Sequence, residues 1–116
     1  MDKTVEKVCA DIRALAEPEK IILYNEKQGM GGDVSSFKLC VIVGAEERRR
    51  ADPRDPDRRD SDPRSLEERI YMQVECPVTF DVLVYSRADW ERLLSEPDSF
   101  ARRIAGMGRV LYEQAR

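Results

Sequence analysis

The amino-acid sequence predicts an α/β (α+β) domain in which helices pack on a small mixed β-sheet. Segments with apolar residues at three- and four-residue steps alternate with short runs rich in β-branched residues, and these patterns are typical of amphipathic helices and buried strands. The chain has 116 residues, a common length for one domain. We therefore expect a single domain over residues 1–116, with a charged, flexible loop at about residues 45–64.

In the first half of the chain, the patterns predict one helix and two strands. Apolar residues at helical spacing predict a helix over residues 4–16, and Pro18 ends it because proline disfavours helical backbone at the preceding residue. The run KIILY predicts a buried strand at residues 20–24, and a glycine-bearing loop or hairpin follows at residues 25–36. The run FKLCVIV predicts a second strand at residues 37–43. Because this run is almost continuously apolar, we expect cover on both of its faces.

In the second half, the predicted order is helix, strand, two helices and strand. Residues 65–74 should form a helix, with Ser65 as its N-cap and Glu68 completing a capping box. Residues 77–85 should form the third strand, with one acidic residue among apolar ones. The last predicted elements are helices at residues 86–94 and 100–105 and a short strand at residues 109–112.

Composition excludes several classes of function. The sequence contains no histidine, so Ser-His or Cys-His nucleophilic catalysis and His-ligated zinc are excluded. Cys9, Cys40 and Cys76 lie among apolar neighbours, which predicts buried, reduced thiols. The net charge is only −3, no run approaches the roughly 20 apolar residues of a membrane span, and no signal peptide is visible. We therefore expect a cytoplasmic protein that does not bind membranes.

The charged loop contains two arginine clusters, residues 48–50 and residues 58–59. Arginines of this kind can contact the phosphates of nucleic acids. Aspartates are interleaved with them, however, and no aromatic side chain is present to stack on bases. We interpret the loop as solvated and self-neutralising, and nucleic acid is not an expected partner.

Two long segments carry a resemblance to a known family. The first, KIILYNEKQGMGGDVSSFKLCVIV, has a strand with an aromatic end, a glycine-bearing stretch, and two serines that open an apolar strand. The second, TFDVLVYSRADWERLLSEPDSFARRIAGMGRVLYE, has a strand with one acid, two helices and a closing Gly-x-Val-Leu-Tyr-Glu. These segments resemble the minimal nucleotidyltransferases of the polymerase-β-like superfamily. The resemblance covers most of residues 4–113 outside the charged loop, and it implies a nucleotidyltransferase-like fold.

The resemblance also implies where a catalytic site would lie. In that family, two or three carboxylates on adjacent strands hold two Mg²⁺ ions, and a Gly-Ser turn grips the phosphate tail of the nucleotide. The Gly-Ser pair falls here on Asn25 and Glu26, and the Ser-Asp-x-Asp motif falls on Ser35, Ser36, Phe37 and Lys38. Of the family's metal-binding acids only the third is retained, as Asp81. Ser36 and Lys38 therefore stand where the other two acids would be.

Lysine in place of a carboxylate should repel Mg²⁺. If Lys38 and Asp81 lie on neighbouring strands, they could form an ion pair in the place of the metal. Alternatively, Lys38 simply faces solvent at the start of a strand. If the site is active, Glu26 and Asp33 are candidate displaced metal ligands, although displaced carboxylates seldom reproduce a two-metal geometry.

A second set of residues is predicted to bind nucleotide. Its members lie around the glycine-bearing stretch: Asn25, Glu26, Gly31, Gly32 and Ser35. The glycines have another interpretation, because glycine also serves simply to permit positive φ in a turn, and the spacing of a P-loop is missing.

The function implied is that of a catalytically degenerate nucleotidyltransferase, a pseudoenzyme that acts as a binding or regulatory, antitoxin-like subunit. The resemblance implies a helical HEPN-type protein as a partner, and a nucleotide and a second copy of the chain are further candidates. One alternative is an active Mg²⁺-dependent nucleotidyltransferase that uses Asp81 with non-standard ligands and transfers NMP to a protein or small molecule. The other is a structural dimerisation module. No cofactor is expected, except Mg²⁺ if the protein is active.

Overall fold

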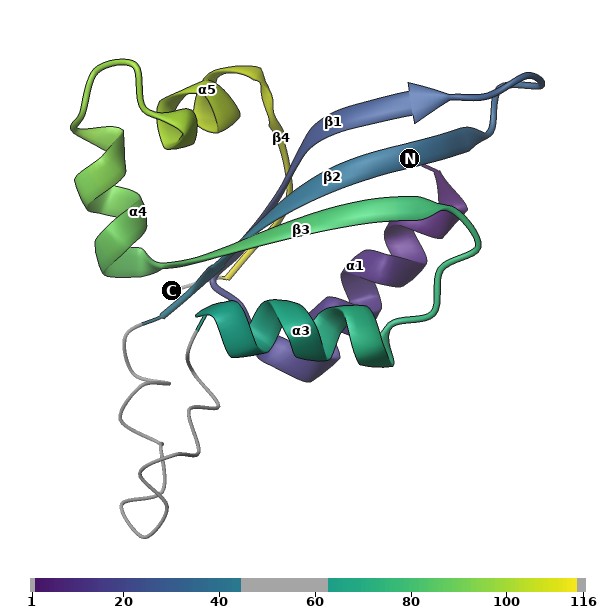
Figure 1. Cartoon of the computed structure of the whole chain (residues 1–116), viewed down its shortest axis with the longest axis horizontal. Coiled ribbons are helices and arrows are strands. Elements are labelled where there is room, and N and C mark those ends of the chain that lie inside the picture. Colours follow the sequence, from purple (N-terminus) through teal and green to yellow (C-terminus); the bar gives the residue numbers. More distant parts are fainter. Residues whose placement is uncertain (1, 45–62, 115–116) are drawn as a thin grey trace, which may run out of the picture.

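A four-stranded mixed sheet with helices packed on it forms the protein (Figure 1). The computed structural model describes residues 2–44 and 63–114, so the predicted charged loop lies almost wholly outside the described residues. The strands, in the spatial order β3-β2-β1-β4, are β1 (Lys20–Gln28), β2 (Val34–Val43), β3 (Thr79–Ser86) and β4 (Arg109–Glu113). β1 is antiparallel to both β2 and β4, and β2 is parallel to β3. The predicted α+β class and the predicted order of elements are confirmed.

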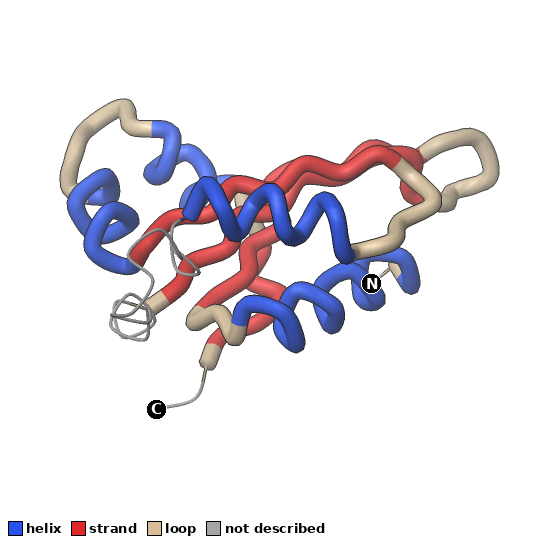
Figure 2. The backbone as a smooth tube through the Cα atoms, turned by 60° about the horizontal axis from the view of Figure 1, so that its bottom comes forward, coloured by secondary structure: helices blue, strands red, loops and turns tan. Residues whose placement is uncertain are grey.

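The described helices cover both faces of the sheet (Figure 2). They are α1 (Lys3–Ala16), α3 (Pro63–Gln73), α4 (Arg87–Leu94) and α5 (Phe100–Met107). α1 and α3 share one core with Leu39, Val41 and Val43 of β2. α4 and α5 share a second core with Cys40 and Ile42. Alternate residues of β2 therefore enter different cores, which confirms the predicted cover on both faces.

The hairpin of β1 and β2 is longer than predicted, and its tip extends past the helices (Figure 1). β1 continues through the polar residues 25–28, which pair with residues 34–38 of β2. Only residues 29–33 form the turn, in which Gly31 (φ 98°) and Gly32 (φ 89°) adopt backbone angles that favour glycine. Asp2 caps the start of α1, and its other carboxylate oxygen accepts a hydrogen bond from the N–H of Val34 at 3.3 Å, which ties the hairpin to the helix.

The predicted capping box of α3 is wrong, because the helix begins at Pro63 and Ser65 lies inside it. Proline is well tolerated in the first turn, where its missing N–H costs no hydrogen bond. α3 runs beside β3, which is an edge strand of the sheet. The Tyr71 hydroxyl accepts a hydrogen bond from the N–H of Val82 at 2.7 Å, and Glu67 Oε1 accepts one from the N–H of Val84 at 2.8 Å. These two side chains satisfy backbone groups that an edge strand otherwise exposes.

The C-terminal helices begin where the sequence predicted. The hydroxyls of Ser86 and Ser99 act as N-caps of α4 and α5. α5 passes through Gly106 and ends at Met107, two residues later than predicted, with Gly108 as its C-cap. A Cβ on Gly108 would lie 2.4 Å from Cγ2 of Ile22 and 2.6 Å from the carbonyl oxygen of Ile104, so glycine is needed for the close approach of the chain to β1.

The three cysteines are free thiols, as predicted. Cys9 and Cys40 are buried and Cys76 is partly buried. Burial raises the pKa of the Cys40 thiol to about 12. Among the described helices, none has both the length and the apolar character needed to cross a membrane.

Candidate functional site

The register of the sheet brings four of the predicted site residues onto one face. Lys38 on β2 lies directly opposite Asp81 on the parallel neighbour β3. Ser36 lies two residues before Lys38, and alternate residues of a strand share a face. Asn25 pairs with Lys38 from β1. Lys38 and Asp81 therefore lie on neighbouring strands, which is the condition that an ion pair between them would require.

This face belongs to the side of the sheet that α4 and α5 cover, at the point where their cover ends. The next pair along the same face, Cys40 and Leu83, packs in the core of α4 and α5, whereas Lys38 and Asp81 are exposed. Tyr24 lies at the border of the exposed part of this face, which carries Lys38 and Asp81. Burial raises the pKa of its phenol to about 12, and the Asp81 carboxylate contributes to this shift after the thiol of Cys40.

The ion pair that Lys38 and Asp81 could form is not present within the described residues. Within the described residues, neither side chain takes part in an ion pair with N and O atoms 4.0 Å or less apart. Both head groups face solvent, so the charges are hydrated and gain little from contact.

Glu26 and Asp33 do not join Asp81. Glu26 pairs with Phe37, whose side chain enters the core beneath α1 and α3, so Glu26 lies on the opposite face from Asp81. Asp33 lies in the hairpin turn, where its carbonyl oxygen accepts a hydrogen bond from Gly29. In the described ranges, no three Cys, Asp or Glu side chains gather in a way that could hold a metal ion.

The predicted nucleotide-binding residues are distributed along the hairpin. Asn25 and Glu26 lie within β1, which corrects the expectation of a turn at the Gly-Ser position. Polar residues here pair with β2 and continue the strand. Gly31 and Gly32 shape the turn at the hairpin tip, and the Ser35 hydroxyl donates a hydrogen bond to the carbonyl oxygen of Lys27 at 3.2 Å. Their role in nucleotide binding stays a prediction.

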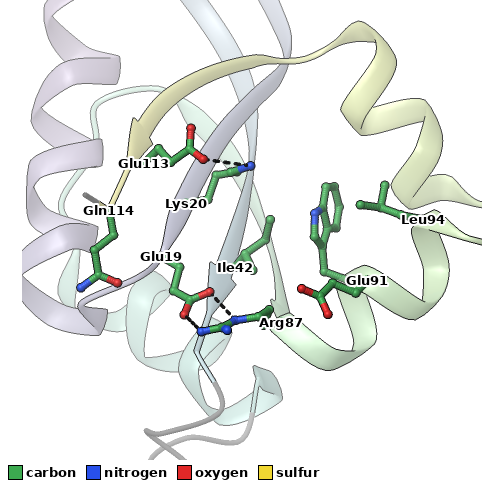
Figure 3. A pocket seen from close by; sticks show the side chains of 9 residues that line it. Glu19, Lys20, Ile42, Arg87, Glu91, Leu94, Glu113 and Gln114 are labelled. Carbon is green, nitrogen blue, oxygen red and sulfur yellow. Dashed lines mark hydrogen bonds and ion pairs between the residues drawn. The ribbon is translucent and has the colours of Figure 1, made fainter. Parts of the chain in front are cut away.

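A cavity of about 450 Å³ lies at the end of the sheet away from the hairpin tip (Figure 3). Its walls come from the start of β1, the end of β2, α4 and the end of β4. The described residues that line it are Glu19, Lys20, Ile42, Arg87, Trp90, Glu91, Leu94, Glu113 and Gln114. Those from α4 are spaced three and four residues apart, so a single face of this helix forms one wall.

Two ion pairs cross the cavity wall (Figure 3). Arg87 Nε donates a hydrogen bond to Glu19 Oε2 at 2.9 Å, and Arg87 Nη2 donates a second one to Glu19 Oε1. Lys20 Nζ lies 3.6 Å from Glu113 Oε1. Gly44 accommodates the first pair, since a Cβ at this position would lie 2.8 Å from Glu19 Oε1.

The sequence patterns did not predict this cavity. Glu19 and Arg87 are 68 residues apart, and neither belongs to a recognisable motif. The available signal was the face of α4, where charged and apolar side chains alternate at helical spacing. Comparisons of the chain with protein-family models, with curated proteins and with solved structures find no match.

Proposed function

We propose that this protein is a nucleotidyltransferase-like protein without catalytic activity, which acts as a binding or regulatory, antitoxin-like subunit. The observation that carries the proposal is the position of Lys38 directly opposite Asp81, on neighbouring parallel strands and on one face. This is the arrangement in which the family resemblance would require two metal-binding carboxylates.

The donor set at this position does not fit Mg²⁺. Mg²⁺ prefers oxygen ligands and is usually held by one or two carboxylates, and a two-metal site needs ligands for ions about 4 Å apart. Ser36 supplies a neutral hydroxyl and Lys38 supplies a positive charge. Because adjacent strands are about 4.8 Å apart, the ammonium group of Lys38 can reach the space in front of Asp81 and repel a divalent cation.

The same residues can take part in binding. The ammonium group of Lys38 can pair with a phosphate, and Asn25 adds an amide beside it on the same face. A nucleotide is therefore one candidate ligand of this surface. The helical HEPN-type protein partner and the antitoxin-like role rest on the resemblance.

The test of the proposal is nucleotide transfer. The full chain is incubated with Mg²⁺ and α-labelled nucleoside triphosphates, beside Asp81→Ala and the surface control Asp89→Ala. We expect the unaltered protein to transfer no more label to protein or small-molecule acceptors than Asp81→Ala does. Robust transfer that is lost in Asp81→Ala and kept in Asp89→Ala would instead show an active enzyme.

A thermal-shift screen with nucleotides separates a binding protein from a structural module. A ligand that binds only the folded state raises the melting temperature by mass action. We expect a nucleotide-dependent rise that Lys38→Ala reduces. If no nucleotide changes the melting temperature, nucleotide binding by this surface is wrong.

A further inference from the structure

The cavity beside α4 has the size of a site for a small ligand or a single side chain. Small-ligand sites commonly have volumes of about 300–1,000 Å³, and this cavity has about 450 Å³. It lies at the carboxyl ends of the parallel strands β2 and β3, where open α/β sheets often bind their ligands. It is separate from Lys38 and Asp81, since Ile42 in its wall lies four residues further along β2.

Among the described residues of the cavity wall, one carboxylate has no cation paired with it. Glu19 is paired with Arg87, and Glu113 is paired with Lys20. Glu91 on α4 is exposed, and it forms no ion pair within the described part of the chain. Among the described residues of this wall, three carboxylates and two cations therefore give a net negative charge.

An apolar surface lies next to Glu91. On α4, Trp90 directly precedes Glu91 and Leu94 lies three residues after it, and Ile42 of β2 also lines the cavity. Trp90 is 6 % exposed and Ile42 is 3 % exposed, so the surface is held in place by the core of α4 and α5. An aliphatic chain can pack against such a surface, and a cation can also lie against an indole ring.

An anion fits this cavity less well. It would have to compete with the Glu19 carboxylate for Arg87, which is already bound through two nitrogen atoms. A cation can pair with Glu91 and displaces neither ion pair.

We propose that this cavity binds an organic cation, namely a guanidinium or primary ammonium group carried on an aliphatic arm. The cationic group pairs with the carboxylate of Glu91, and the arm packs on Trp90, Ile42 and Leu94. This chemistry has two sources: a basic side chain of a protein partner, or a free alkylamine or alkylguanidine.

The sequence provides a reporter for this site, since Trp90 is its single tryptophan. Trp90 fluorescence of the full chain is titrated with n-butylguanidinium, with its neutral counterpart n-butylurea as the control. We expect a saturable change with the cation only. Glu91→Gln should weaken binding about tenfold, because a charge-assisted hydrogen bond is lost. The matched control Glu96→Gln removes a charge just after α4 but outside the cavity wall, and it should leave binding unchanged.

Two further probes distinguish between the two sources of the organic cation. Tighter binding of Nα-acetyl-arginine methylamide assigns the site to a protein side chain, and tighter binding of agmatine assigns it to a free amine. The proposal is overturned if no cation gives a saturable change, if n-butylurea binds as tightly as the cation, or if Glu91→Gln and Glu96→Gln behave alike.

Discussion

Lys38 and Asp81 lie opposite each other on the parallel strands β2 and β3, one pair beyond the core of α4 and α5. Both side chains are exposed and share a face. In the nucleotidyltransferase family proposed above for this chain, carboxylates from neighbouring strands share metal ions. Under the proposed function, the lysine opposite Asp81 is the change that should abolish metal binding.

Placing carboxylates at residues 36 and 38 should create a metal site. In the variant Ser36→Asp/Lys38→Asp, three carboxylates would share one face of β2 and β3. We expect saturating Mn²⁺ to raise its melting temperature by roughly 5 °C, since about 1 kcal/mol of linked binding shifts a domain of this size by that amount. The measurement is thermal unfolding with and without Mn²⁺.

Two controls accompany this variant. Adding Asp81→Asn should remove the Mn²⁺ response, and the unaltered protein should show none. An equally large response in the unaltered protein would contradict the view that Lys38 prevents metal binding.

Gly44 should matter only through the ion pair of Glu19 and Arg87. In Gly44→Ala, the new Cβ would lie 2.8 Å from Glu19 Oε1, so the carboxylate must move. The side chains of Glu19 and Arg87 are 20 % and 36 % exposed, and we expect a loss of about 1 kcal/mol in the free energy of unfolding. In a Glu19→Ala background the same substitution should cost little, because the clashing atom is gone. Urea unfolding of the four proteins measures the coupling, and equal costs in both backgrounds would exclude this mechanism.

Two glycines of the C-terminal segment should respond in opposite ways to alanine. Gly108→Ala places a Cβ 2.6 Å from a backbone oxygen and 2.4 Å from Ile22, so we expect a destabilisation of about 3 kcal/mol. Gly106 lies in α5, and a Cβ there would meet no atom within 4 Å. Gly106→Ala should therefore stabilise the protein by about 0.5 kcal/mol. Chemical unfolding checks both values, and similar effects at the two positions would argue against the packing of α5 on β1.

Tyr71 should protect the edge strand β3. Tyr71→Phe keeps the ring but removes the acceptor of the Val82 N–H. We expect a loss of about 1 kcal/mol in the free energy of unfolding and faster hydrogen exchange at the Val82 amide. The Val84 amide, which donates to Glu67, should be affected less.

Tyr112→Phe is the matched control for Tyr71→Phe. The Tyr112 ring lies under the guanidinium of Arg13, 4.1 Å from its Cζ, and its hydroxyl makes no hydrogen bond within the described residues. Exchange at Val82 should therefore be unchanged in this control. Unchanged exchange in Tyr71→Phe itself would show that the hydroxyl does not protect the strand.

Alkaline pH should destabilise the protein through Cys40 and Tyr24. Burial raises the pKa of Cys40 from 9.0 to about 12. Burial, with smaller contributions from Cys40 and Asp81, raises the pKa of Tyr24 from 10.0 to about 12. The unfolded chain therefore loses these protons at lower pH than the folded protein does, so rising pH favours unfolding. The contribution of the two protonated groups to the free energy of unfolding is fully present below pH 9 and is lost as the pH rises toward 12.

The measurement is the free energy of unfolding in urea at several pH values between about 8 and 11. Cys40→Ala removes one of the two groups, so it should reduce the slope between pH 9 and pH 10 whatever its effect on overall stability. Equal slopes in Cys40→Ala and the unaltered protein would contradict the assignment to Cys40.

The elements that local chemistry specifies were predictable from the sequence. Ser86 and Ser99 cap the helices that follow them, because a hydroxyl satisfies free N–H groups at the start of a helix. The almost continuous apolar run of β2 correctly predicted that both faces of this strand are covered by other elements. Where two local signals competed the prediction was wrong: Pro63 begins α3 ahead of the capping box at Ser65.

Pairing across the sheet was decided only by the tertiary structure. Residues 25–28 are polar, and they extend β1 because the backbone of β2 provides their hydrogen-bond partners. The strand propensity of a residue does not include the stabilisation that comes from such pairing. A shift of one residue in the register of β2 and β3 would also change what lies opposite Asp81. The resemblance suggested that Lys38 stands where a metal-binding acid would be, but its place beside Asp81 could not be predicted from the sequence.

The cavity beside α4 depended entirely on distant parts of the chain. The sequence alone determined that Arg87, Trp90, Glu91 and Leu94 would share one helix face. It did not determine what this face would meet, because Glu19 is 68 residues from Arg87 and becomes its neighbour only through the strand order. Helical periodicity is a local property of the chain, whereas a cavity is formed by segments that only folding brings together.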